Sequence, residues 1–238
     1  MSQSFVVVDL ETTGLSPDKH HIIEIGAMKV KEGKVVDTYS ELLYPGYPLP
    51  PMITEITHIT DTMLVGKPSF GKVAQSFYEF LEELPLLGHN VAFDYRFLKV
   101  NFERLGIAYE RKLIDTLTIA KELHGELESR SLENMCGYYN LHNESAHRAF
   151  EDVKVTYQLY NRMRDYARDK GMDVEQLCGE KPYFYKVKKE EPMTGRQKNY
   201  LIDLVKYHKI DTIQTDGLTK RQASRLIDKI ISEYGRRK

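Results

Sequence analysis

Two carboxylates separated by a single residue, Asp9 and Glu11, come directly after an apolar run of four residues. In a β-strand, residues two apart face the same side, so this spacing predicts that both carboxylates point together. Two such groups repel each other, and their burial is unfavourable unless a cation lies between them. Oxygen ligands favour a hard cation such as Mg²⁺ or Mn²⁺. The alternative is a solvated strand end, but Thr12, Thr13 and Gly14 add hydroxyls and a flexible backbone where a ligand can approach.

Two further acidic positions lie at predicted helix starts. In GHNVAFD, a short strand ends in polar residues and a helix begins near Asp94. In HRAFED, the spacing of five places His147 at or just before a helix start and Asp152 in the second turn of that helix. Each segment alone has an ordinary alternative, Asp94 as a helix cap and the other two as surface residues.

Taken together, DLETTG at 9–14, HNVAFD at 89–94 and HRAFED at 147–152 resemble, in order and spacing, the motifs of the DEDDh 3′–5′ exonucleases. This family contains the proofreading subunit of bacterial DNA polymerase III, and the resemblance covers about residues 4–170. It implies an RNase H-like fold, two divalent cations (Mg²⁺ or Mn²⁺), and hydrolysis that releases nucleoside 5′-monophosphates from nucleic-acid 3′ ends.

The resemblance also implies a role for each catalytic residue. Asp9 would bridge both cations, Glu11 and Asp152 would hold the one that activates water, and Asp94 would support the second. His147 is the implied general base, because the ordinary pKa of histidine lies near the operating pH.

Substrate contacts are expected from residues in and near these motifs. The expected set is Thr12, Thr13, Gly14, His58, Ile59, Asn90 and Phe93. Stacking on bases is the expected role of His58, Ile59 and Phe93, with ordinary core packing as the alternative for the last two. The family usually has glycine where this chain has His58. His89 either joins the site or satisfies local backbone groups, and we expect Asp115 to be structural.

The elements that must position these residues follow from hydrophobic periodicity. Strands are predicted at 4–11, 22–31, 34–43 and 86–89, and helices at 69–83, 93–105, 115–123 and 146–170. The turn signal Glu32-Gly33 favours an antiparallel meander of the first three strands, and the Pro-rich segment after them reads as a loop. The order predicts an α/β fold, an RNase H-like mixed sheet flanked by helices, plus a small α-helical C-terminal appendage.

The net charge of −1 hides an asymmetry. Residues 1–180 carry 19 Lys+Arg and 28 Asp+Glu, whereas residues 181–238 carry 15 and 7. We therefore expect two parts with different tasks. The predicted boundaries are an exonuclease domain at 1–178, a linker at 179–193, and a basic module at 194–238 with helices at 194–208 and 219–234. We expect no internal repeat.

The basic residues of the C-terminal module favour nonspecific contact with phosphates, which would raise the local concentration of substrate. A solvated helical appendage and a protein-docking module are the alternatives.

The composition and missing motifs exclude several other functions. With 238 residues, 41% hydrophobic and 29% charged, the chain is ordinary for a globular protein. Its longest apolar run is four residues, whereas a membrane span needs about 20, and no signal-peptide pattern precedes it. We therefore expect a cytoplasmic protein without a membrane partner. Dinucleotide, Walker A, nucleophile-elbow and H-E-x-x-H motifs are absent.

The favoured function is a metal-dependent 3′–5′ exonuclease acting on single-stranded DNA in proofreading or repair, with a polymerase or repair protein as a possible partner. A 3′–5′ exoribonuclease in RNA processing is the nearest alternative. The sequence gives no clear sign of a 2′-hydroxyl contact in either direction, so the preference between DNA and RNA stays open. A non-catalytic nucleic-acid-binding or docking protein is the alternative of another class.

Overall fold

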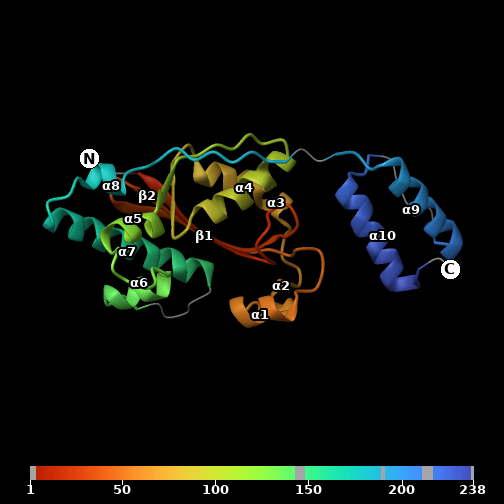
Figure 1. The fold of residues 1–238 in the computed structure, drawn as a ribbon, viewed down its shortest axis with the longest axis horizontal. Helices are drawn as coiled ribbons and strands as arrows, with labels where there is room; N and C mark the ends of the chain where they lie inside the picture. Colours follow the sequence, from red (N-terminus) through yellow and green to blue (C-terminus); the bar gives the residue numbers. More distant parts are fainter. Residues whose placement is uncertain (1–3, 143–147, 189–190, 211–216, 237–238) are drawn as a thin grey trace. The chain divides into compact units, whose positions relative to one another are not determined.

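The structure, a computed structural model, describes residues 4–142, 148–188, 191–210 and 217–236 (Figure 1). The chain divides into two compact units, residues 1–185 (unit 1) and residues 186–238 (unit 2). Among the helices of the described residues, none is both long and apolar enough to cross a bilayer.

The centre of unit 1 is a five-stranded sheet with the order β3-β2-β1-β4-β5. Its strands are β1 (Phe5–Thr12), β2 (Ile22–Lys31), β3 (Lys34–Leu42), β4 (Leu86–Gly88) and β5 (Leu113–Asp115). The first three strands form the predicted antiparallel meander, β4 pairs with β1 in parallel, and β5 pairs with β4 in parallel. The mixed sheet with flanking helices confirms the expected fold class.

Helices cover both faces of this sheet (Figure 1). Those of unit 1 are α1 (Pro51–Thr57), α2 (Asp61–Leu64), α3 (Phe70–Leu81), α4 (Ala92–Arg104), α5 (Thr116–Leu123), α6 (Leu132–Tyr138), α7 (Ala149–Asp169) and α8 (Val174–Cys178). One apolar core lies between the sheet and α3 with α4, and a second lies between the sheet and α5 with α7.

Side chains alternate along β1, and this alternation determines which of the two cores each side chain joins. Val6 and Val8 belong to the core under α3 and α4, whereas Phe5 and Val7 belong to the core under α7. Because the period is two, Asp9 and Glu11 continue the second row, the one that faces α7. The acids are thus placed at the end of an apolar row.

Gly26 allows the start of α7 to lie directly on the sheet. A Cβ atom at this position would come within 2.4 Å of the carbonyl carbon of Ala149, the first residue of α7. Gly26 is also the strand partner of Asp9. The close approach therefore brings the N-terminus of α7 next to Asp9.

Several short elements differ from the sequence prediction. The Pro-rich segment is not all loop, because Pro51 begins α1, a position where the fixed φ of proline suits a helix. The elements α2, α6, α8 and β5 were also not predicted, since three to seven residues show too little periodicity. Unit 1 extends past residue 178, because Lys181 and Leu113 exchange backbone hydrogen bonds of 2.8 and 2.9 Å.

Unit 2 consists of α9 (Gly195–His208) and α10 (Lys220–Tyr234). Its core is formed by Leu201, Leu204, Ile227 and Ile230. The expectation of no internal repeat is wrong, because T-x-R-Q-x-x-x-L-I-D occurs at both 194–203 and 219–228. In each copy the threonine caps the helix and the glutamine completes a capping box, which explains why these positions recur.

Candidate active site

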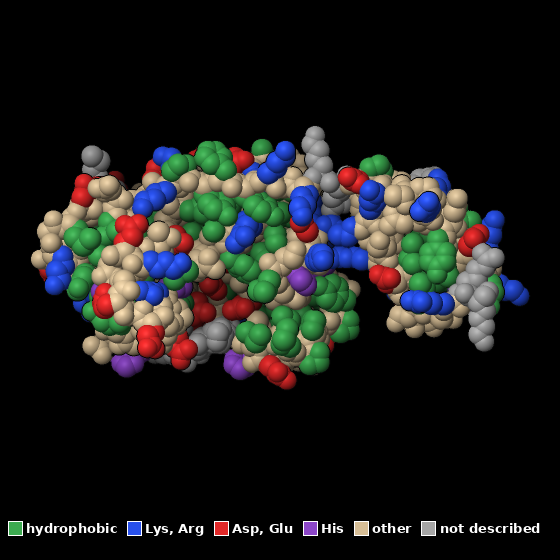
Figure 2. All heavy atoms as spheres, viewed as in Figure 1, with side chains coloured by type: hydrophobic (Ala, Val, Ile, Leu, Met, Phe, Trp, Pro, Cys, Tyr) green, Lys and Arg blue, Asp and Glu red, His purple; other side chains and the backbone are tan. Residues whose placement is uncertain are grey.

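Three carboxylates, Asp9, Glu11 and Asp152, form an acid cluster. One ligand oxygen from each lies within 4.8 Å of the others. The first two come from β1 and the third from α7, so residues far apart in the sequence meet at the place where α7 crosses the sheet. Figure 2 shows acidic side chains in a hollow of unit 1.

Asp152 lies in the first turn of α7, not in the second turn as predicted. The reason is that the helix begins at Ala149, after Arg148 in extended conformation, rather than at residue 146. The later start makes Asp152 an acid at a helix N-terminus, where the helix dipole favours negative charge.

Asp94 reaches β1 from α4 and contacts the backbone of the strand. It lies in the first turn of α4, is buried, and accepts a 3.0 Å hydrogen bond from the backbone N–H of Leu10. Burial and the charge of Asp9 raise the pKa of Asp94 well above its ordinary value. This carboxylate is therefore close enough to act on the acid cluster without belonging to it.

The acid cluster resists ionisation. Burial, together with the charges of Asp152 and Glu24, raises the pKa of Asp9 to about 8. Burial, with Asp9 as the largest charge contribution, raises the pKa of Glu11 to about 9. A neighbouring cation would relieve both effects, because it stabilises the ionised forms.

The fourth acid of this face, Glu24, was missed by sequence reasoning. It is the strand partner of Glu11 and is 2% exposed. Its carboxylate binds the guanidinium of Arg148 at 2.8 Å and accepts the backbone N–H of Ala149 at 3.1 Å. Glu24, which lies in β2, thereby caps the N-terminus of α7. The only signal in the sequence is a single acid within the apolar run IIEIG.

The residues of the acid cluster fit a divalent cation. All donors are carboxylate oxygens, which suit hard ions such as Mg²⁺ and Mn²⁺. Arg148 is engaged by Glu24, and its charge offsets only part of the repulsion that raises the pKa of Glu11. The raised pKa values of Asp9 and Glu11 are what such a site shows without its ion.

The hydroxyls of Thr12 and Thr13, expected to bind substrate, are engaged within the protein. Thr12 donates to the carbonyl of Gly14 at 2.9 Å. The Thr13 hydroxyl lies 2.9 Å from the Tyr47 hydroxyl and accepts the backbone N–H of His21. Both threonine side chains are buried. They shape the loop after β1, and Tyr47 supports it.

His58 and Ile59 have opposite environments. Ile59 is fully buried in a core with Ile23, Ile53 and Leu64, so the expected base contact by its side chain is wrong and the core alternative holds. His58 is exposed at the end of α1 with φ of 58°, a left-handed conformation that glycine adopts readily. This conformation explains why the family usually has glycine there.

Residues 89 and 90 of the second motif form hydrogen bonds with Asp115, Thr116 and Arg130. Asn90 is exposed with φ of 63°, and its backbone N–H donates to Asp115 at 2.8 Å. His89 bonds the Thr116 hydroxyl and the carbonyl of Arg130, both at 2.9 Å. These contacts favour local structural roles for His89 and Asp115. Phe93 is half-buried, so part of its ring is accessible.

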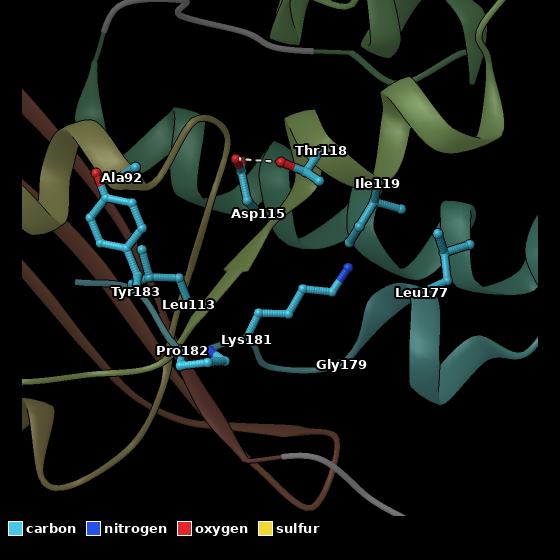
Figure 3. Close-up of a pocket in the computed structure, with 10 residues that line it drawn as sticks. All are labelled: Ala92, Leu113, Asp115, Thr118, Ile119, Leu177, Gly179, Lys181, Pro182 and Tyr183. Carbon is cyan, nitrogen blue, oxygen red and sulfur yellow. Dashed lines mark hydrogen bonds between the residues drawn. The ribbon is translucent and has the colours of Figure 1, made fainter.

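His147 lies outside the described residues, so its role as general base stays a prediction. A pocket between β5, α5, α8 and the segment after α8 is lined mainly by apolar side chains and the stem of Lys181 (Figure 3). Its wall includes Asp115 with its hydrogen bond to Thr118 but no member of the acid cluster.

Residues 6–160 match the family described as Exonuclease (RNase_T). Residues 187–236 match a family described as a protein of unknown function (DUF3072). The first match spans the sheet and the whole acid cluster, whereas the second spans both helices of unit 2.

Similar curated proteins are DNA polymerases III of the PolC type. The protein from Lacticaseibacillus paracasei is 39% identical over 173 residues, which are 72% of this chain and 12% of the relative. The protein from Thermotoga maritima is 41% identical over 170 residues, 71% of this chain and 12% of the relative. The chain therefore spans about one eighth of the length of these relatives.

Similar solved structures share the fold. Exonuclease X in complex with 5′ overhanging duplex DNA has a TM-score of 0.53 and 24% identity, covering 73% of this chain and 97% of that chain. Exonuclease I of E. coli in complex with a dT13 oligonucleotide has a TM-score of 0.62 and 20% identity, covering 71% of this chain and 42% of that chain.

Proposed function

The chain belongs to the exonuclease family, and from that membership we propose that its acid cluster removes nucleotides from the 3′ ends of single-stranded DNA. The observation that carries the proposal is the meeting of carboxylate oxygens of Asp9, Glu11 and Asp152 within 4.8 Å, where burial and mutual repulsion raise the pKa values of Asp9 and Glu11. Bound cations would neutralise these carboxylates. They would also stabilise the negative charge that develops on the phosphate when a phosphodiester is hydrolysed.

Two divalent cations, Mg²⁺ or Mn²⁺, are the cofactors that we propose. When bound, such ions activate water and stabilise a leaving oxygen. Asp9, Glu11 and Asp152 would hold them, and Asp94 would support the second from α4. Glu24 is not proposed as a ligand, because Arg148 already engages its carboxylate. His147 is the proposed general base, from its place in the third motif.

DNA is the proposed substrate rather than RNA. The PolC-type relatives are DNA polymerases, and both solved neighbours described above hold DNA. Half-buried Phe93 and exposed His58 offer ring surface for stacking on bases, a contact that reads no particular sequence. Because the relatives are polymerases, proofreading or repair beside a polymerase is the proposed setting.

The test uses a 5′-labelled single strand incubated with Mg²⁺. Removal from the 3′ end yields a ladder of shortening labelled products, whereas removal from the 5′ end releases the label at once as a mononucleotide. We expect the ladder, its loss in EDTA, and its recovery with Mn²⁺. RNA of the same sequence should shorten more slowly.

The matched variants are Asp152→Asn and Asp165→Asn, the same change at two positions of α7. Asp152 belongs to the acid cluster, whereas Asp165 is exposed and pairs with Arg168. We expect Asp152→Asn to lose at least about a thousandfold in rate and Asp165→Asn to keep the wild-type rate. Equal rates in the two variants, or release of the label at once, would refute the proposal.

A further inference from the structure

Unit 2 has a net positive charge, whereas unit 1 has a net negative charge. Residues 186–238 hold 14 Lys+Arg and 7 Asp+Glu. Figure 2 shows Lys and Arg side chains around a hydrophobic patch on the visible face of this unit. A match to a family of unknown function assigns no role to this charge.

The two helices of unit 2 run in the same direction. Their N-terminal ends are joined because the N–H of Met193 donates to the carbonyl of Leu218 at 2.8 Å. Their C-terminal ends are joined because His208 lies 3.0 Å from the carbonyl of Gly235. Parallel packing along the whole length fixes which side of each helix faces solvent.

The solvent side of α10 carries a row of cations. Arg221, Arg225 and Lys229 follow one another at intervals of four residues, on the side away from buried Ala223 and Ile227. Arg225 and Lys229 are exposed, whereas Arg221 is half-buried and its Nε atom is buried. Like charges at this spacing repel one another and destabilise a helix. The helix holds four cations and two acids, Asp228 and Glu233, so its charge is positive in excess. Lys229 lies 3.9 Å from Glu233, and Arg221 and Arg225 also interact with other groups of the protein.

A second row on α9 combines a cation with aromatic rings. Arg196, Tyr200 and Tyr207 are separated by four and seven residues, which places them on one side of the helix. The tyrosines are 38% and 51% exposed, and Asp203 lies between them. Exposed aromatic rings beside cations are the contacts with which proteins bind single strands without reading sequence.

We propose that these two rows bind single-stranded nucleic acid, the α10 cations contacting phosphates and the α9 tyrosines stacking on bases. The rows do not form one flat patch, since each lies on the solvent side of its own helix. A flexible single strand can follow both, whereas a duplex, with a persistence length of about 50 nm, cannot. The surface does no chemistry, and the proposed function enters only through the class of ligand.

The test measures binding by the full-length chain in EDTA, with fluorescence anisotropy of a labelled 20-nucleotide strand and of its duplex over a series of KCl concentrations. The background variant Asp152→Asn prevents hydrolysis, so the outcome does not depend on catalysis. The first variant combines R221Q, R225Q and K229Q. Its control combines K34Q, K72Q and K121Q, which removes the same charge from exposed positions of unit 1.

Each phosphate contact on a single strand contributes about 0.7 to the slope of log K against log[salt]. We therefore expect the α10 variant to lose about 2 from this slope and at least about tenfold in affinity at 0.1 M salt. The unit 1 control should stay within about twofold of the starting protein. Tyr200→Ser with Tyr207→Ser should lower the affinity about fivefold or more and leave the slope unchanged.

Circular dichroism melts accompany each variant, so a loss of helix is distinguished from a loss of contact. The proposal is overturned if the starting chain does not bind the strand, or if the α10 variant keeps its slope and affinity. It is also overturned if the unit 1 control loses as much, or if duplex binds as tightly as single strand. The last two results would indicate general charge attraction or a different partner.

Discussion

The acid cluster should make the metal-free protein lose stability as the pH rises. The pKa values of Asp9 and Glu11 are raised from 3.8 and 4.5 to about 8 and about 9 in the folded chain. Unfolding therefore releases protons between about pH 5 and pH 9, and the free energy of unfolding falls as the pH rises through this interval. Asp9→Asn removes one of the charges without changing the shape of the side chain.

The magnitude follows from the separation of the carboxylates. At the limit of 4.8 Å and an effective dielectric constant of about 20, each ionised pair repels with about 3 kcal/mol. Because Asp9 is only half-buried, we expect solvent to reduce this to about 2–4 kcal/mol for all its neighbours together. At about 2–4 °C for each kcal/mol, Asp9→Asn should melt roughly 5–15 °C above the wild type at pH 9.5.

The assay is thermal unfolding in EDTA at pH 6 and at pH 9.5. At pH 6 both acids are protonated in the folded protein, so the two proteins should melt within a few degrees of each other. Mg²⁺ should raise the melting temperature of the wild type at pH 9.5 more than that of Asp9→Asn. Asp165→Asn, at an exposed position of α7, should follow the wild type throughout. A difference between wild type and Asp9→Asn that does not grow with pH would refute the reasoning.

Three further predictions concern the supports of the site. Glu24→Gln weakens the buried acceptor that binds Arg148 and caps α7, so we expect a loss of about 1–2 kcal/mol in urea unfolding and at least tenfold lower activity at saturating Mg²⁺. Wild-type values for both would contradict the capping role. Gly26→Ala should lower the free energy of unfolding by about 1–3 kcal/mol, because the new methyl group would lie 2.4 Å from the backbone of α7. The control Gly137→Ala adds a methyl group to α6 with no atom within 4 Å, so it should stabilise the protein slightly. Tyr47→Phe should cost about 1 kcal/mol and raise KM more than it lowers kcat, since it loosens the loop after β1; a change in kcat alone would argue against this.

The centre of the site was predictable because it rests on short-range rules. The period of two put Asp9 and Glu11 on one side of a strand, and three motifs in order named the residues that meet there. The meander and the long helices followed from turn signals and from periodicity over ten or more residues. Asp94 at a helix start also agrees with the structure, where it lies in the first turn of α4.

What the sequence could not supply depends on register and on short elements. The role of Glu24 requires knowing that it is paired with Glu11 and lies beneath the start of α7. The burial of Ile59 depends on α1 and α2, which are too short to show a period. The turn of Asp152 was misplaced because the start of α7 is determined by a contact from β2 rather than by local propensity. The repeat in unit 2 was visible, but its meaning emerged only from the two capping boxes.

The acids that meet at the site come from three regions of the chain, β1, α4 and α7, and Asp152 lies 143 positions after Asp9. Chains emerge from the ribosome N-terminus first, so Asp9, Glu11 and Asp94 are exposed to the cell well before their last companion. Until α7 is made and seated against Gly26, a nascent chain has no complete acid cluster. The cluster is therefore completed only when the sheet and its covering helix exist, and a truncated product that ends before Asp152 lacks one of its three carboxylates.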